Sequence, residues 1–154
     1  MPGAFVWTIR QLKDDETLVL FTGALDERSN LGSFPRLEGV VTFDLAGVIR
    51  VTSGGVNRWI QLLSRLDGVT HLYYVRCSIP TVGQINMVRG FQGKGVVRSF
   101  YAPYICEETG EEENVLMTPE QITDINSPPR FTTEAGELVF GDLPRRYFAF
   151  LGAE

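Results

Sequence analysis

The chain is organised around Val40-Val41-Thr42-Phe43-Asp44-Leu45, an apolar run that lies between Gly39 and Gly47. A short run of this kind, bounded by turn-forming residues, is typical of a strand buried in the middle of a sheet. We therefore expect residues 40–45 to form a central strand whose neighbours come from the flanking segments.

A helix is predicted directly after this strand. Thr52 or Ser53 can cap its start, and Asp67-Gly68 ends it. Between these limits apolar residues recur three and four positions apart, which is the pattern of a helix with one buried face. The residues expected on that face are Val56, Trp59, Ile60, Leu63 and Leu66.

The segment before the central strand predicts a β-hairpin. Aromatic and apolar side chains alternate with smaller or polar ones in residues 5–9, and a turn at residues 13–16 leads into a β-rich run at residues 18–21. Turn formers and a proline follow in residues 25–37, where we expect at most a short irregular helix.

The segment after the central helix predicts two more strands, at residues 72–77 and 95–101. Ser78 can cap a helix between them that extends to Val88. Strands joined through helices usually pair in parallel by right-handed crossovers. The expected fold class is therefore α/β, a mixed sheet with helices packed on it.

Charge divides the chain into two parts. Residues 1–106 carry 11 basic and 8 acidic side chains, a net charge of plus 3, whereas residues 107–154 carry 3 and 11, a net charge of minus 8. The second part has short apolar pieces separated by prolines and glycines, which predicts a small loop-rich β-subdomain. We place the domains at residues 1–99 and 100–154. We expect the aromatic residues 143–151 to dock on the body or on another protein.

Composition argues against several classes of function. The 154 residues include 44% hydrophobic and 21% charged side chains, the balance of a soluble globular protein. No apolar run approaches the roughly 20 residues of a membrane helix, and the first residues lack the pattern of a secretion signal, so we expect a cytoplasmic protein with no membrane partner. Two cysteines argue against a disulfide scaffold, and the single histidine, His71, removes the usual general base from most catalytic schemes.

The segment Asp44-Leu-Ala-Gly-Val-Ile-Arg-Val-Thr-Ser-Gly-Gly-Val56 resembles the central strand, loop and helix start of STAS domains, the sulfate-transporter and anti-sigma-factor-antagonist family. The resemblance covers residues 5–99. It implies a STAS-like mixed sheet in a bacterial regulatory protein.

In anti-sigma-factor antagonists of this family, a serine in the turn accepts a phosphate that switches the binding of a partner kinase. The matching residue here is Gly54, and Thr52 and Ser53 stand where the family has its Asp and its first Ser, so the acceptor hydroxyl is displaced or absent. We expect Ser53 to cap the helix. Phosphorylation of Ser53 or Thr52 is the alternative, because a phosphate there would meet the free N–H groups of the helix start.

The C-terminal part resembles a zinc ribbon that has lost its metal. In bacterial proteins of this arrangement, a segment like Ser99-Phe-Tyr-Ala-Pro-Tyr-Ile-Cys106 opens a CxxC knuckle and a second CxxC follows. The matching positions here are Cys106, Thr109, Thr132 and Ala135, and one thiolate cannot hold a structural zinc. We therefore expect no metal and no other cofactor. Aromatic packing should replace the zinc, by Phe100, Tyr101, Tyr104, Phe131, Phe140, Tyr147, Phe148 and Phe150.

Other reactive or charged residues have structural explanations. Cys77 ends a buried strand and is expected in the core. The carboxylates of residues 107–113 match no calcium-binding loop, so a solvated turn is expected there. Arg89, Lys94 and Arg98 lie among aromatic residues, but the acidic chain as a whole argues against nucleic acid. We expect these cations to face the acidic C-terminal part or an acidic partner.

We expect a non-catalytic module that binds protein partners in bacterial regulation or scaffolding. Two alternatives stay open: a regulator switched by a kinase at Ser53 or Thr52, and a small ligand-binding domain or enzyme with a pocket near Asp44 and Arg50. The aromatic tail and an unpaired edge strand also leave a homodimer open. Polar residues on or beside apolar helices mark the expected contact surface: Thr52, Ser53, Gly54, Asn57, Arg58, Gln84, Asn86 and Arg89.

Overall fold

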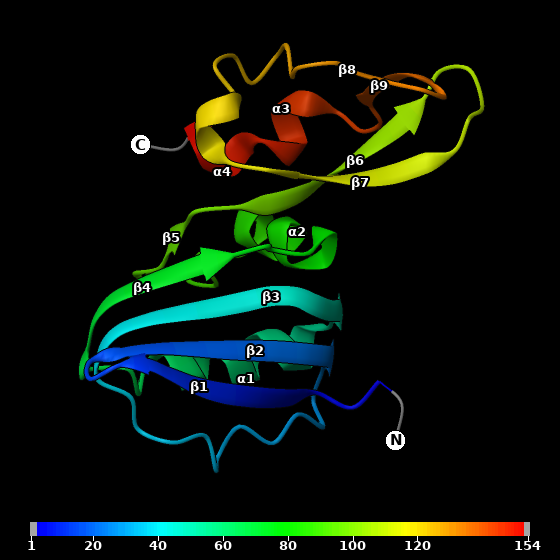
Figure 1. Cartoon of the computed structure of the whole chain (residues 1–154). Helices are drawn as coiled ribbons and strands as arrows, with labels where there is room; N and C mark the ends of the chain where they lie inside the picture. The colour runs from blue at the N-terminus through cyan, green and yellow to red at the C-terminus, as the bar shows by residue number, and fades with distance from the viewer. Residues whose placement is uncertain (1–2, 153–154) are drawn as a thin grey trace.

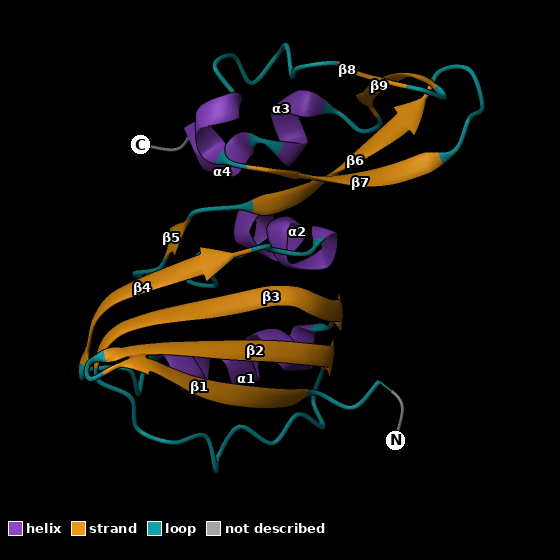
Figure 2. Cartoon of the chain, viewed as in Figure 1, coloured by secondary structure: helices purple, strands orange, loops and turns teal. Residues whose placement is uncertain are grey.

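A computed structural model of the chain describes residues 3–152 (Figures 1 and 2). Its strands are β1 (Val6–Lys13), β2 (Glu16–Leu25), β3 (Gly39–Val51), β4 (Val69–Val75), β5 (Val96–Val97), β6 (Phe100–Cys106), β7 (Glu112–Met117), β8 (Phe131–Thr133) and β9 (Gly136–Phe140). Its helices are α1 (Ser53–Leu63), α2 (Ile79–Met87), the 3-10 helix η1 (Pro119–Gln121), α3 (Pro144–Tyr147) and α4 (Ala149–Gly152). Within this described part, no helix has both the length and the apolar character needed to cross a membrane.

The first sheet has the order β1-β2-β3-β4-β5 and confirms the predicted mixed topology. β1 and β2 form the expected antiparallel hairpin, and the strands from β2 to β5 are parallel to one another. The predicted central strand is β3, the middle strand, which continues past Gly47 to Val51. β2 approaches β3 closely at Gly47, since a Cβ on this residue would lie 2.5 Å from Cγ2 of Thr22.

One face of this sheet forms the main core, and we call it the covered face. Residues paired across neighbouring strands share a face. Val19, Phe43 and Tyr74 are paired in this way and are at most 1% exposed. The covered row continues to Ile9 on β1 and Val97 on β5.

α1 packs on the covered face and lies behind the sheet in Figure 1. The Trp59 ring meets the Phe43 ring edge-on at 5.6 Å, and its indole N–H donates a hydrogen bond of 3.0 Å to the carbonyl of Phe91. Ile60, expected on the buried side, is 37% exposed, so this part of the prediction was wrong. Each residue turns a helix by about 100°, which places Leu62 rather than Ile60 against the sheet.

The connection between β2 and β3, residues 26–38, consists of turns and irregular chain, and this described stretch contains no helix. Leu31, Phe34 and Leu37 are nevertheless buried. The Phe34 ring packs against Phe21 of β2 at 5.9 Å. The connection therefore closes the core beside α1.

The strand predicted at residues 95–101 is two strands in different sheets, a difference that the sequence pattern concealed. β5 pairs with β4 in the first sheet, and β6 belongs to the second, whose order is β7-β6-β9-β8 and whose strands are antiparallel. The crossing occurs at Ser99, whose carbonyl accepts from the Cys77 N–H at 3.2 Å. Its hydroxyl oxygen accepts from the Arg76 N–H at 2.7 Å. Ser99 thus pairs with the end of β4 where the chain changes sheet.

The predicted docking of the aromatic C-terminal residues on the body is confirmed. Phe148 is fully buried, and its ring lies 6.1 Å from that of Phe100. The Tyr104 ring lies 5.2 Å from Phe131 and 5.6 Å from Phe140. Buried side chains of both sheets belong to one continuous hydrophobic core. The second sheet, α3 and α4 therefore share a core with the first sheet.

Candidate functional site

The start of α1 is capped by Thr52 and not by Ser53, so the expectation for Ser53 was wrong. The Thr52 hydroxyl accepts a hydrogen bond from the Gly55 N–H at 3.2 Å and donates one to Oε1 of Glu27 at 3.3 Å. Ser53 is exposed at the first turn of the helix. Of the two hydroxyls considered for phosphorylation, that of Ser53 is the one that faces solvent.

Glu27 covers the position that matches the phosphate acceptor of the family. A Cβ on Gly54 would lie 2.6 Å from Cβ and 3.0 Å from Cα of Glu27, closer than atoms pack. The Arg58 guanidinium donates to the Glu27 carbonyl at 3.0 and 3.3 Å. Thr52, Gly54 and Arg58 thus have contacts within the chain. Ser53, Asn57 and Arg58 are the exposed residues in this part of the expected contact surface.

The contact residues expected on the second helix also differ in whether they are bonded within the chain or exposed. The Asn86 amide donates to the carbonyl of Tyr147 and accepts from the N–H of Phe150, both at 2.8 Å, so it holds the C-terminal helices. Gln84 is half-buried and Arg89 is exposed. Figure 1 places α1 behind the first sheet and α2 beyond the end of β4. The structure therefore does not bring the expected contact residues of α1 and those of α2 together on one surface.

The structure does not bring Asp44 and Arg50 together, although the ligand-binding alternative placed one pocket near both. Asp44 is 8% exposed, and its Oδ2 accepts from Nε and Nη2 of Arg76 at 3.0 and 2.8 Å. This hydrogen-bonded carboxylate raises the pKa of the Arg76 guanidinium. Arg50 lies 3.6 Å from Asp26 instead. The two residues thus belong to two separate ion pairs.

The remaining reactive side chains are placed as core or surface groups. Cys77 is fully buried, as predicted, and burial raises its thiol pKa to about 12, so it is not a nucleophile near neutral pH. His71 is exposed on β4 and contacts Thr70 at 3.3 Å.

The cations expected to face the acidic part have other partners. The Lys94 ammonium donates to backbone carbonyls of Leu66 and Val69. The Arg98 guanidinium lies over the Tyr73 ring, 3.5 Å from its centroid. Both side chains therefore have partners within the first hundred residues, so the expected contact with the acidic C-terminal part was wrong for them, whereas a contact with an acidic partner stays a prediction.

The four positions that match zinc ligands lie at two turns that face each other. The Cys106 thiol donates to the carbonyl of Ala135 at 3.6 Å, and hydrogen bonding from Thr109 lowers the pKa of this thiol. The Thr132 hydroxyl donates to Glu137 at 2.6 Å. Two hydroxyls and a methyl group are not zinc ligands, so the residues present do not fit this metal.

An arginine joins the two turns. Arg130 donates to Glu107 at 2.8 Å and to Glu137 at 3.0 Å. These contacts raise the pKa of Arg130, and hydrogen bonds from Thr132 and Arg130 lower the pKa of Glu137. Residues 3–152 contain no group of three His, Cys, Asp or Glu side chains arranged to hold a metal ion.

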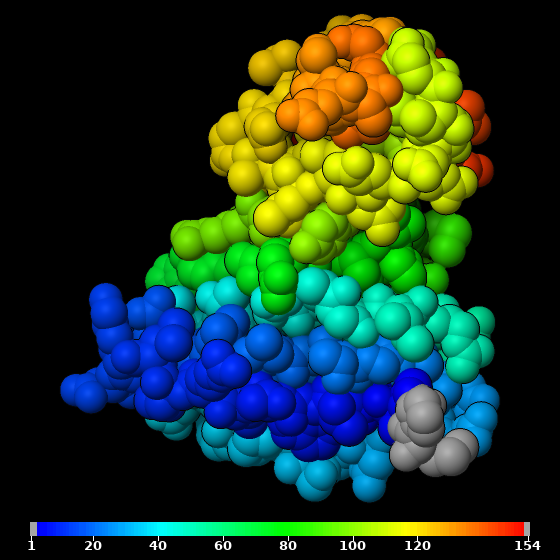
Figure 3. All heavy atoms as spheres, turned by 45° about the vertical axis from the view of Figure 1, so that its right-hand side comes forward, coloured from blue at the N-terminus to red at the C-terminus, as the bar shows by residue number. Residues whose placement is uncertain are grey.

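The second face of the first sheet, which we call the open face, was missed as a candidate. It is formed by the rows that alternate with the covered ones, and the described chain places no helix in front of β1, β2 and β3 (Figures 1 and 3). Its central row contains Arg10, Leu18, Thr42, Tyr73 and Val96, none of which is fully buried. The alternation of residues 18–21 carried this signal, because Leu18 and Leu20 must point away from Val19 and Phe21.

Apolar side chains dominate the open face, and charged groups of both signs lie among and beside them. Leu18, Leu20, Val40, Tyr73 and Val75 are all half-buried, and Val96 is 53% exposed. The charged groups on or beside this surface are Arg10, Glu16, Arg98 and the ion pair of Asp44 and Arg76.

No protein-family model, curated protein or solved structure matches the chain in comparisons with each of these three groups.

Proposed function

We propose that the chain is a non-catalytic module that binds a partner protein through its open face. The observation that carries this proposal is the uncovered side of β2, β3 and β4. Sheets made only of parallel strands are almost always covered on both faces, and four of the five strands of this mixed sheet, β2 to β5, are parallel. Here α1 covers one face, whereas half-buried apolar side chains line the other. A second protein bound to this surface would bury these apolar side chains.

The chemistry of the open face defines the partner. Tyr and Arg are enriched in protein interfaces and among the residues that dominate binding energy. Tyr73 and Arg98 already stack on each other toward the β5 edge of the face, so little side-chain entropy is lost when a partner covers them. Arg10 adds a further cation at the β1 side. The partner therefore has an apolar patch with carboxylates beside it.

Affinity purification from the native cell, with quantification of each recovered protein, tests the proposal. Thr42→Arg places a long cation at the centre of the open face, and Tyr73→Ala removes the aromatic anchor. Ser53→Arg is the control, because Ser53 is exposed on α1 at the opposite side of the sheet. Circular dichroism verifies that each variant is folded. We expect a partner that the wild type and Ser53→Arg recover and that both open-face variants lose.

Two outcomes would overturn the proposal. One is an unchanged set of partners with both Thr42→Arg and Tyr73→Ala. The other is a partner that Ser53→Arg alone loses, which would assign binding to the α1 surface. A recovered partner is then purified, and its affinity for the three variants is measured by calorimetry.

A further inference from the structure

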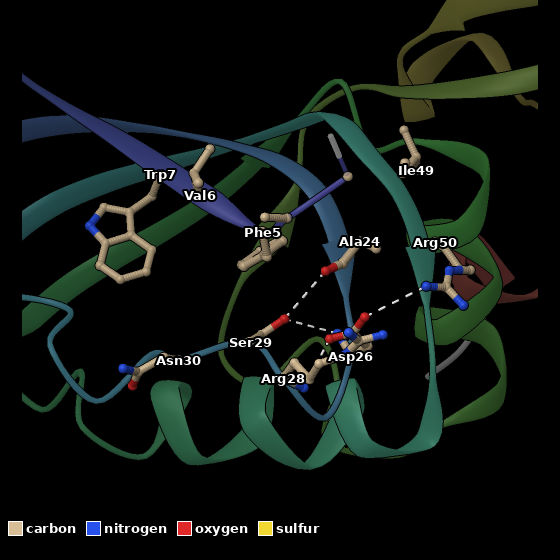
Figure 4. Close-up of a pocket in the computed structure, with 12 residues that line it drawn as sticks. Phe5, Val6, Trp7, Ala24, Asp26, Arg28, Ser29, Asn30, Ile49 and Arg50 are labelled. Atoms are coloured by element: carbon tan, nitrogen blue, oxygen red, sulfur yellow. Dashed lines mark hydrogen bonds and ion pairs between the residues drawn. The ribbon is translucent and has the colours of Figure 1, made fainter. Parts of the chain in front are cut away.

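A hollow of about 690 Å³ lies on the covered side of the first sheet, apart from the open face. It is situated where β2 and β3 end, between the first residues of β1 and the connection after β2 (Figure 4). Ligand pockets have volumes of roughly 300 to 1,000 Å³, and ligands of open α/β sheets bind at the carboxyl ends of the strands. Both the size and the place of this hollow are those of a ligand site.

One end of the hollow is aromatic. The Phe5 ring stacks on Phe21 at 5.3 Å, and the Trp7 ring meets Phe34 edge-on at 5.3 Å. These contacts fix both rings from behind, while each ring remains half-exposed on its other side. In Figure 4 Phe5 lies between Trp7 and the charged residues. The aromatic end is thus preformed for an apolar body.

The other end of the hollow is cationic. Asp26 lies 3.6 Å from Nη2 of Arg50, a distance without a hydrogen bond, and its Oδ1 accepts from the Arg28 N–H at 2.9 Å. The Arg28 guanidinium has no carboxylate partner among residues 3–152. This end therefore contains two guanidinium groups and one carboxylate, and it carries a net positive charge.

Among the neutral polar side chains of the hollow, Asn30 keeps a free donor group and Ser29 does not. The Ser29 hydroxyl accepts from the Asp26 N–H at 2.9 Å and donates its proton to the Ala24 carbonyl at 3.3 Å. The Asn30 side-chain oxygen accepts from the Gly32 N–H at 3.1 Å, which leaves its NH₂ group as the unused part. A surplus of donors and positive charge selects an anion.

We propose that this hollow binds an aromatic carboxylate, with its ring on Phe5 and Trp7 and its carboxylate on Arg28 and Arg50. The guanidinium groups match a carboxylate through paired hydrogen bonds, and the ring buries apolar area against the two aromatic side chains. No bond is made or broken, so the site is one of binding. The proposal is independent of the partner that the open face takes, because different residues form the two surfaces.

Hydrocinnamate is the probe, and hydrocinnamyl alcohol is its uncharged counterpart. Binding is followed by tryptophan fluorescence and by calorimetry on the full chain. Trp59 is buried in the core, so a ligand in the hollow changes the emission of Trp7, and Trp7→Phe removes this signal. We expect the acid to bind saturably and at least about tenfold more tightly than the alcohol.

Substitution of the cations completes the test. Arg28→Met and Arg50→Met should each weaken the acid about tenfold and leave the alcohol unchanged. Arg89→Met is the matched control, because Arg89 is exposed on another part of the molecule and should bind the acid as the wild type does. Three results would overturn the proposal: no saturable binding of the acid up to about 1 mM, equal binding of acid and alcohol, or full binding by both Arg28→Met and Arg50→Met.

Discussion

Arg76 donates two hydrogen bonds to a single carboxylate oxygen of Asp44, from Nε at 3.0 Å and from Nη2 at 2.8 Å. Asp44 lies on β3, and Arg76 follows β4 with a backbone φ of 50°, the left-handed conformation that favours glycine. The carboxylate is buried, whereas the Arg76 side chain is 44% exposed. The negative charge of this ion pair is therefore buried, whereas its positive charge is partly exposed to solvent.

This inequality predicts how substitutions of Arg76 affect stability. Arg76→Met leaves a buried carboxylate without its partner and should lower the free energy of unfolding by about 2 kcal/mol. Arg76→Gly removes the same partner but relieves left-handed strain of roughly 1 kcal/mol, so it should be less destabilising. Urea denaturation measures both. Arg10→Met, an exposed control, should stay within about 0.5 kcal/mol of the wild type. Equal losses of stability in Arg76→Met and Arg76→Gly would contradict the backbone strain at this position. Losses no larger than that of Arg10→Met would contradict a stabilising ion pair.

A serine at position 54, which the STAS resemblance matches with the phosphate acceptor, should destabilise the chain. In Gly54→Ser the new Cβ would meet Cβ of Glu27 at 2.6 Å, and the helix start must shift, at a cost of about 1 to 3 kcal/mol. Glu27→Gly removes one of the colliding atoms and should recover part of this loss in a double-mutant cycle. Thermal unfolding of Gly54→Ser, Glu27→Gly, the double variant and the neutral control Ser53→Ala checks this. Additive effects of the two changes would show that Glu27 does not close this position.

Burial of Cys77 predicts a loss of stability in alkali. The folded-state thiol pKa, about 12, lies above the ordinary value of 9.0, so the unfolded chain ionises first. The stabilisation is complete below about pH 9 and is lost as the pH rises toward 12. At about pH 10 the wild type should lose roughly 1 kcal/mol relative to Cys77→Ala, beyond their difference at pH 7.

Cys106 supplies the control for this experiment, because Thr109 lowers its thiol pKa instead of raising it. Cys106→Ala should therefore retain the alkaline loss of the wild type. Denaturant titrations at a series of pH values give the comparison. A Cys77→Ala variant that loses stability in parallel with the wild type would refute the explanation.

The facing turns of the second sheet predict that a zinc site can be rebuilt. Thr109→Cys, Thr132→Cys and Ala135→Cys together would place three thiols beside Cys106, and four thiolates bind zinc tetrahedrally. We expect one zinc per chain by elemental analysis, with a melting temperature that falls on chelation. The variant with Thr109→Cys alone should bind no zinc tightly. A folded triple variant without zinc would argue against the ribbon resemblance.

Local periodicity was sufficient to predict most of the first sheet. The run around Phe43, the alternation of β2 and the spacing of Val56 and Trp59 each reflect contacts of one element with one buried surface. Ile60 was misplaced because the apolar stripe of α1 is broader than the surface that it covers. The predicted domain boundary after residue 99 lies where the chain changes sheet, but the predicted strand at residues 95–101 ran across it. Both halves of this strand are β-rich, and only their pairing with distant residues, such as that of Phe100 with Cys77, distinguishes them.

The candidate sites depended more on contacts between distant residues. Glu27 lies 25 positions from Thr52, and Asn86 lies 61 positions from Tyr147, so no local pattern reports that these polar groups are already bonded. The hollow likewise combines Phe5 and Trp7 with Arg28 and Arg50, which come from three separate segments. Exposure of a polar residue on a helix was therefore a weak guide to availability for a partner.

The two hydrogen bonds of Asn86 also imply an order of folding during translation. A ribosome adds Asn86 to the chain 61 residues before Tyr147 and 64 before Phe150, which supply the partners of the Asn86 amide. Until then Phe100 lacks the aromatic neighbours Phe148 and Phe150 that enclose it. A nascent chain can form its first sheet early, but the apolar surface around Phe100 stays exposed until translation reaches α3 and α4. Chaperones would bind the nascent chain at this surface.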